Sequence, residues 1–127
     1  MQHLKIFNVE KLGEALIVTP VGEGSAFRYQ DLHLETNAVR GYLSQPDVRL
    51  LVLDLKMIDY FGSEFIGALV SMLREMRTRG RKACFCNGNE QVQQILKNMS
   101  LFKLWPLYAS REEALSELTA VSNTKSN

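Results

Sequence analysis

The chain has 127 residues, of which 46% are hydrophobic, and its formal net charge at pH 7 is +1. This length and composition predict a single folded domain rather than a disordered chain. The balanced charge gives no reason to expect nucleic-acid binding. No apolar run approaches the roughly 20 residues that cross a bilayer, and residues 1–16 lack the layout of a secretory signal. We therefore expect a cytoplasmic protein with no direct membrane insertion.

The first third of the chain predicts a hairpin followed by a helix. Residues 4–9 and 14–20 are short runs rich in Leu, Ile, Val and Phe, and a turn containing Gly13 separates them. The glycine-containing stretch that follows is expected to be a loop. From Asp31 the apolar residues recur at helical intervals, until Pro46 disfavours helix in the residue before it.

The middle third predicts a buried strand and a long helix. Residues 48–55 read VRLLVLDL, a near-continuous apolar run typical of a strand that is buried on both faces. Residues 63–79 carry an apolar stripe at helical spacing, and Gly80 is placed to end that helix. The basic residues around Gly80 are interpreted as compensation of the helix dipole.

The last third predicts two strands that alternate with two helices. Residues 83–86 form the first strand, and Asn89 is placed to cap a helix that starts near Glu90. Residues 101–108 contain a proline, which favours an edge strand. Ser110 then begins a capping box that opens the final helix.

The resulting order, β-β-α-β-α-β-α-β-α, predicts an α/β fold. We expect a mixed sheet of about five strands with about four helices packed mainly on one side. The domain is expected to span residues 1–120, followed by a flexible polar tail at 121–127.

No cofactor or metal site is expected. Cys84 and Cys86 would lie on the same face of a strand, but no second Cys or His pair has matching spacing, and His3 and His33 are far away in sequence. We interpret the two cysteines as small, reduced core residues. The chain has neither GxxxxGK[ST] nor GxGxxG, the common phosphate-binding glycine loops.

Catalytic chemistry is also missing from the sequence. Asp54 and Asp59 could form a carboxylate pair, but Asp54 lies between leucines and is expected to end its strand or cap the turn. We therefore predict a binding module and not an enzyme.

The segment from Leu53 to Gly67 contains the most informative residue, Ser63. It follows a buried strand and opens a helix, at the kind of turn that often carries function. Ser63 can act as an N-cap, or it can present its hydroxyl to a partner.

Several segments, in this order and spacing, resemble STAS domains, in particular bacterial anti-sigma factor antagonists. The matching segments are Leu53-Asp54-Leu55, Ser63, Gly67, Ser100-Leu101-Phe102 and Glu113-Ala114-Leu115. The resemblance covers about residues 4–118. It implies a STAS-type fold and protein–protein recognition in a partner-switching circuit that regulates transcription.

The resemblance also implies a partner and a modification. Ser63 falls on the family's phospho-acceptor serine, and the partner would be an anti-sigma factor or serine kinase. The oligomeric state, monomer or homodimer, stays open. Residues around the turn would contact the partner: Tyr60, Phe61, Gly62, Ser63, Glu64, Phe65 and Gly67.

The turn departs from the family pattern at three positions. Gly62 replaces an aspartate, Glu64 replaces a second Ser or Thr, and Phe65 replaces a glycine. Two further readings therefore stand beside the phosphorylation switch. One is a cytoplasmic STAS subunit of a membrane transport system, which would use apolar contacts. The other is a non-phosphorylated ligand sensor with a pocket under the loop at 24–30.

Overall fold

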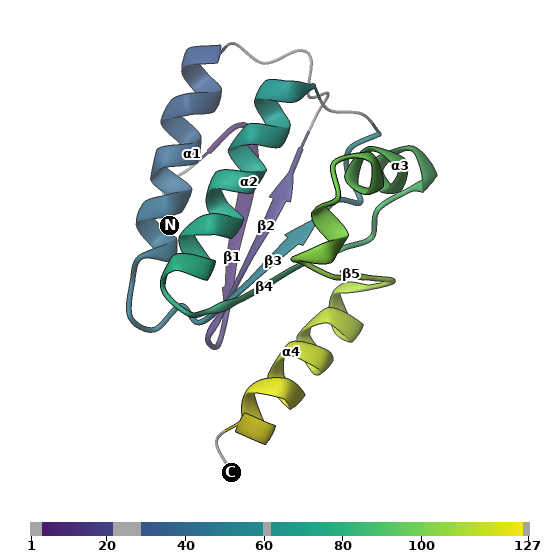
Figure 1. Ribbon diagram of the computed structural model, residues 1–127. Coiled ribbons are helices and arrows are strands. Elements are labelled where there is room, and N and C mark those ends of the chain that lie inside the picture. Colours follow the sequence, from purple (N-terminus) through teal and green to yellow (C-terminus); the bar gives the residue numbers. More distant parts are fainter. Residues whose placement is uncertain (1–3, 22–28, 60–61, 126–127) are drawn as a thin grey trace.

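The computed structural model describes residues 4–21, 29–59 and 62–125, with the backbone alone at 29 and 120–125. Its strands are β1 (Phe7–Leu12), β2 (Ala15–Pro20), β3 (Leu50–Asp54), β4 (Lys82–Cys86) and β5 (Leu107–Tyr108). Its helices are α1 (Tyr29–Leu43), α2 (Ser63–Thr78), α3 (Glu90–Asn98), α4 (Arg111–Lys125) and the short 3₁₀ helix η1 (Leu101–Lys103). The strands form one sheet with helices on both faces (Figure 1).

The sheet has five strands in the order β1-β2-β3-β4-β5. β1 is antiparallel to β2, as the predicted hairpin requires, and each of the other neighbouring pairs is parallel. Gly13 turns the hairpin with a φ of 61°, a backbone conformation that glycine adopts without a steric cost. All five residues of β3 are buried, which agrees with its continuous apolar sequence.

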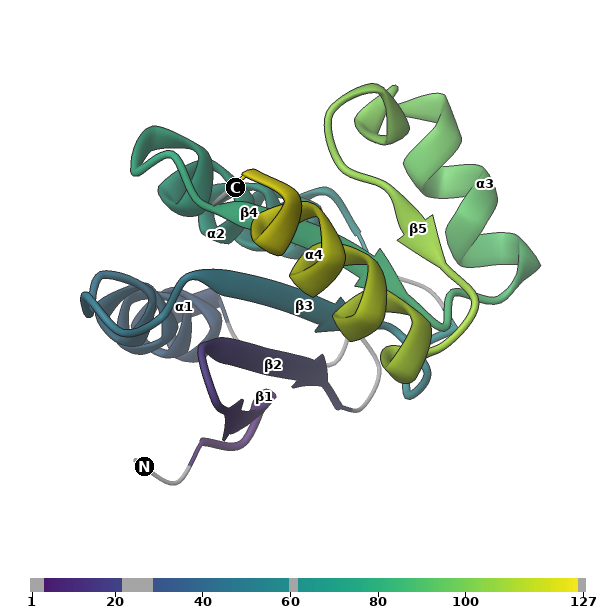
Figure 2. The same ribbon diagram turned by 90° about the horizontal axis from the view of Figure 1, so that it is seen from below.

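The two faces of the sheet bury different sets of residues. On one face, Leu51, Leu53 and Phe85 belong to the larger core together with apolar residues of α1, α2 and α3. On the other face, Val52 and Cys84 pack with residues of α4. Figure 2 shows α4 crossing β3 and β4 on the side opposite α1 and α2. The predicted mixed sheet, with helices mainly on one side, is confirmed.

Three helix ends follow the chemistry that the sequence predicts. At the end of α2, Gly80 has a φ of 71°, and the backbone N–H of Arg81 donates to the Met76 carbonyl at 2.8 Å. Asn89 caps α3, since its side-chain oxygen accepts from the Val92 N–H at 2.8 Å. Ser110 accepts from the Glu113 N–H at 3.1 Å, as a capping box requires.

The strand predicted over residues 101–108 is wrong over most of its length. Ser100 adopts a left-handed φ of 58°, which turns the chain directly into η1. Leu101 and Trp105 are buried, so the segment folds back onto the core instead of running along the sheet edge. Only β5 remains as a strand. At the C-terminus, α4 continues to Lys125, which includes most of the predicted tail.

Candidate partner-binding site

The turn between β3 and α2 is held near both of its ends. At the strand end, Oδ1 of Asp54 accepts hydrogen bonds from the backbone N–H of Lys56 at 3.2 Å and from Nδ2 of Asn87 at 3.0 Å. Further along, Oδ1 of Asp59 accepts from Nδ2 of Asn89 at 3.0 Å. The segment between β4 and α3 therefore fixes the path by which the chain reaches α2.

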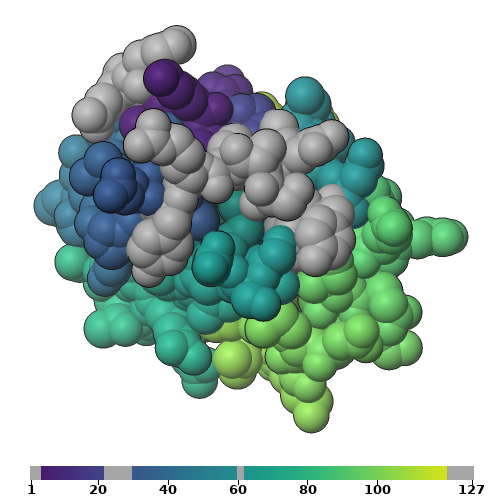
Figure 3. Space-filling view, turned by 90° about the horizontal axis from the view of Figure 1, so that it is seen from above, coloured from purple at the N-terminus to yellow at the C-terminus, as the bar shows by residue number. Residues whose placement is uncertain are grey.

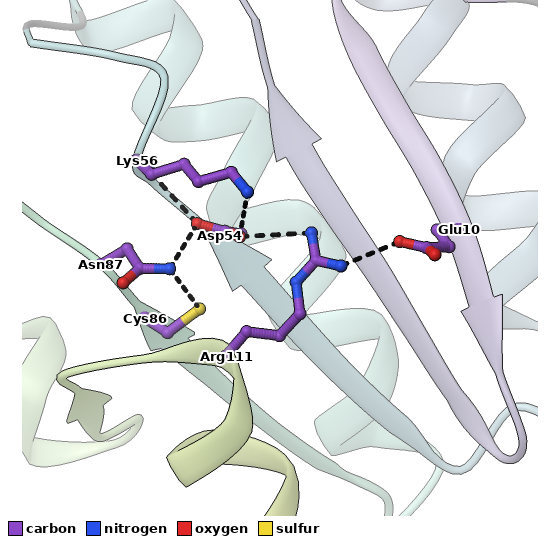
Figure 4. A network of polar contacts seen from close by, with 6 residues as sticks. All are labelled: Glu10, Asp54, Lys56, Cys86, Asn87 and Arg111. Atoms are coloured by element: carbon purple, nitrogen blue, oxygen red, sulfur yellow. Dashed lines mark hydrogen bonds and ion pairs between the residues drawn. The ribbon is translucent and has the colours of Figure 1, made fainter.

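A network of charged side chains surrounds Asp54 (Figure 4). Nη2 of Arg111 donates to Oδ2 of Asp54 at 3.4 Å, and Nζ of Lys56 lies 3.7 Å from the same oxygen. Nη1 of Arg111 donates to Glu10 at 2.9 Å. Asp54 is completely buried, and a buried carboxylate is tolerated only when it is paired and hydrogen-bonded. The prediction that Asp54 ends its strand is confirmed, and Asp59, being exposed, has a separate partner.

Arg111 is the site residue that sequence reasoning missed. Locally it is only the second residue of the capping box of α4. Its contact with Asp54 arises because α4 crosses the second face of the sheet and brings its first residue to Glu10 of β1 and to the end of β3. A contact across 57 positions of sequence leaves no local pattern to detect.

Ser63 is the first residue of α2, and Gly62 occupies the N-cap position, with φ −84° and ψ 179°. No side chain caps this helix, so the reading of Ser63 as an N-cap is wrong. The cap is one residue earlier than that reading requires, and glycine offers no side-chain oxygen there. Ser63 is exposed, and its hydroxyl makes no hydrogen bond to any residue that the structure describes.

The start of α2 suits negative charge. The first helical hydrogen bond runs from the Ile66 N–H to the Gly62 carbonyl at 3.0 Å. The amides of Ser63 and Glu64 therefore have no partner within the helix. These N–H groups give the helix N-terminus a partial positive charge, which favours an anion. Figure 3 shows this end of the molecule, with the start of α2 in teal between α1 and the segment around α3.

The predicted contact residues fall into three groups. Ser63, Glu64 and Gly67 are exposed on α2, and Gly62 is half-buried beside them. Phe65 does not fit a surface role, because it is 1% exposed and its ring centroid lies 5.7 Å from that of Phe7. Its apolar ring is stabilised by burial, which corrects the prediction of a contact there. Tyr60 and Phe61 lie outside the described residues, as does most of the loop at 24–30.

The two cysteines lie on the same face of β4 and are buried, as the sequence predicts, and they pack with residues of α4 as free thiols. Burial raises the pKa of the Cys86 thiol to about 12, and the charge of Asp54 adds to that increase. Burial also raises the pKa of Cys84, with a smaller contribution from Cys86. Across the described ranges, no three His, Cys, Asp or Glu side chains gather as a metal site would require.

A model of the STAS domain family matches residues 7–114. The chain belongs to the STAS domain family. Within the part of the chain that the structure covers, no helix has the length and apolar character needed to span a membrane.

Known proteins similar to this STAS domain include anti-sigma factor antagonists. The anti-sigma F factor antagonist of Paenibacillus polymyxa is 31% identical over 72 residues, which is 57% of this chain and 62% of that protein. The chain thus matches less than two thirds of that relative's length.

Solved structures give the same fold. A putative anti-sigma factor antagonist from Thermotoga maritima has a TM-score of 0.76 at 20% identity, over 89% of this chain and 94% of that one. The anti-sigma factor antagonist SpoIIAA in its unphosphorylated form has a TM-score of 0.74 at 16% identity, over 90% and 96%. Its phosphorylated form has a TM-score of 0.69 at 15% identity, over 87% and 97%.

Proposed function

We propose that this STAS domain is an anti-sigma factor antagonist in the bacterial cytoplasm. It binds an anti-sigma factor or serine kinase through the turn at Gly62-Ser63-Glu64 and the exposed face at the start of α2. Binding sequesters that partner and frees its sigma factor for transcription. The domain itself acts by recognition, without a catalytic step of its own, and any nucleotide belongs to the partner.

The observation that carries this proposal is the state of Ser63. Its hydroxyl is exposed and has no structural duty among the described residues, at the first position of α2. A serine that neither caps its helix nor supports the core is available to a kinase. The relatives support the same role, since the Paenibacillus polymyxa protein is named as an antagonist of anti-sigma F factor.

Phosphorylation would change the charge of this surface without disturbing the fold. A phosphate on Ser63 adds about −1.5 to −2 charges at pH 7, and the N-terminus of α2 stabilises that charge locally. Glu64 already places one carboxylate beside it. A partner that docks closely on this turn would then meet a concentrated negative charge, and so the modified form would release it.

The test is a phosphorylation assay with the cognate kinase, which we expect to be a histidine-kinase-like ATPase and which is to be sought among the neighbouring genes. Wild type should incorporate phosphate from ATP, and Ser63→Ala should not. Ser116→Ala is the matched control, because Ser116 is also an exposed helical serine but lies on α4, which packs on the other face of the sheet. This control should be labelled as well as wild type. Labelling of Ser63→Ala at the wild-type rate would rule out Ser63 as the acceptor.

The switch itself is tested by binding. Ser63→Ala should bind the ATPase as tightly as wild type, whereas Ser63→Asp should bind it more weakly, because the introduced carboxylate partly imitates the phosphate. Equal binding of both variants would instead support a docking surface that stays constant and is not regulated at this residue.

A further inference from the structure

A cleft runs between α1 and α2 and begins at Glu64, the residue that follows Ser63. Its upper part has a volume of about 340 Å³, with Leu32, Thr36 and Ala68 among its lining residues and Glu64 and Gly67 at its edge. It continues into a second hollow of about 400 Å³ that reaches Arg74 and Thr78. Gly67 and Arg40 line both parts. The exposed face of α2 is thus one wall of a continuous groove.

Gly67 keeps this groove open at its middle. The position is exposed and helical, where alanine would be more stable by roughly 0.5–1 kcal/mol. A Cβ atom at Gly67 would meet no other atom within 4 Å, so packing inside this domain does not require glycine. The missing side chain creates space on the outer surface of the domain.

Charge is distributed unequally along the groove. Glu64 makes the end near Ser63 negative. At the other end, Glu75 accepts from Arg40 at 3.1 Å and from Arg79 at 2.8 Å, so one carboxylate serves two guanidinium groups. Arg74 also lines this end and has no carboxylate partner among the described residues. The far end therefore has an excess of positive charge.

We infer that this groove holds an acidic amphipathic helix of the anti-sigma partner, an inference that rests on the proposed function. Glu64 and Thr78, at opposite ends of the groove, are 14 residues apart on α2, which corresponds to about 21 Å, the length of a short helix. Helices commonly bind in such grooves through a few apolar anchors.

The shape and charge of the groove specify two side chains of this partner helix. An aliphatic side chain fits over Gly67, where Ala68 and Leu32 line the hollow. An Asp or Glu faces Arg74, which lies seven residues, or about 10 Å, further along α2. The two contacts are about two helical turns apart, so they lie on the same face of the partner helix. The groove is continuous with the Ser63 turn, and one partner can therefore cover both.

Two pairs of variants test the inference by titration calorimetry against the same ATPase, without ATP. Gly67→Leu fills the groove, and Gly41→Leu is its control, since Gly41 lies on α1, is exposed and has equally open space around its Cβ position. Arg74→Glu reverses the charge at the far end. Arg77→Glu makes the same change in net charge on the same helix, at an exposed position outside the groove.

The groove variants should each weaken binding roughly tenfold or more, and the controls should stay within about twofold of wild type. Thermal unfolding of Gly67→Leu should show a midpoint no lower than that of wild type, so that weaker binding cannot be attributed to a loss of stability. Arg74→Glu tests the other end of the groove independently. If wild type binds and both groove variants bind equally well, the inference is overturned and the proposed function stands. If wild type does not bind, the proposed function itself fails. A wild-type dimer that Gly67→Leu converts to a monomer would place a second copy of this chain in the groove and overturn the assignment.

Discussion

Arg111 and Asp54 join the first residue of α4 to the last residue of β3, with Nη2 and Oδ2 3.4 Å apart. The carboxylate is completely buried, whereas the guanidinium is partly exposed and also reaches Glu10 at the surface. Arg111 therefore connects a buried charge to the outside of the molecule, at the base of the turn that leads to Ser63.

Removal of Arg111 should be costly, because it leaves the buried Asp54 carboxylate with fewer partners. We expect Arg111→Ala to lower the free energy of unfolding by about 2–3 kcal/mol, measured by urea denaturation. Arg74→Ala, at an exposed position, should change it by less than about 0.5 kcal/mol. In an Asp54→Asn background the cost of Arg111→Ala should be smaller. Equal effects of the two arginine substitutions in the wild-type background would contradict the role of Arg111.

The caps of α2 and α3 lead to opposite expectations for two small polar residues. Asn89→Ala should destabilise the domain by about 1–2 kcal/mol, since it removes both the cap of α3 and the contact with Asp59. Ser63→Ala should change stability by less than about 0.5 kcal/mol, because Ser63 caps nothing. Thermal unfolding of the two variants in parallel makes the comparison, and a cost for Ser63→Ala close to that of Asn89→Ala would show a structural role for Ser63.

Glu75 should contribute to stability in a way that depends on acid pH. Its hydrogen bonds with Arg79 and then Arg40 lower the pKa of the Glu75 carboxyl from its ordinary value of 4.5. A carboxyl group whose pKa is lowered in the folded state contributes stability that is fully present above its unfolded-state pKa. That contribution is lost as the pH falls through the folded-state pKa. The stability difference between wild type and Glu75→Gln should therefore be constant near pH 7 and shrink below pH 4.5. A difference that stays constant down to pH 2 would contradict this assignment.

The buried thiols should be inert in the folded domain. With the pKa of Cys86 raised to about 12 and that of Cys84 also raised, neither is a thiolate at pH 8. A thiol reagent at pH 8 should label the native protein only as fast as the domain opens to expose the cysteines. In guanidinium chloride the same reagent should label both cysteines immediately. Rapid labelling of the native protein would mean that α4 does not cover them.

The same shifts fix the sign of an alkaline effect. A thiol whose pKa is raised in the folded state contributes stability that is fully present below its unfolded-state pKa, which is 9.0. That contribution is lost as the pH rises above this value. The stability of wild type relative to Cys84→Ala should therefore decline above pH 9.0. A difference that does not decline between pH 9 and 11 would contradict the raised pKa values.

The sequence predicts those parts of the fold whose signals are local. The apolar run of β3, the glycine at the end of α2 and the capping box of α4 each depend on residues a few positions apart. The strand predicted over residues 101–108 was wrong because the apolar residues there fit a strand as well as a buried 3₁₀ turn. Only the left-handed conformation of Ser100, which is not a glycine, separates the two.

The sequence placed Ser63 correctly at the start of α2, but it did not predict the details around it. The resemblance placed Ser63 at the start of α2, yet whether the cap is at 62 or 63 depends on a backbone angle. Phe65 was assigned to the contact surface because it lies beside Ser63 in the matched turn, although its spacing from Leu69 and Met72 also fits the buried stripe of α2. The groove beside α2 was not predicted, since it forms between residues of α1 and α2 that are far apart in the sequence.

The two faces of the sheet are covered by different numbers of helices, and this difference determines which part of the domain unfolds first. Three helices share the larger core, whereas the second face depends on α4 and a small cluster that includes Ala114 and Leu118. Detachment of α4 exposes little apolar area compared with global unfolding, so it is the partial opening of lowest free energy. Backbone amides of α4 should then exchange with deuterated solvent before those of β3, and the surface around Ser63 can persist while the opposite face is transiently bare.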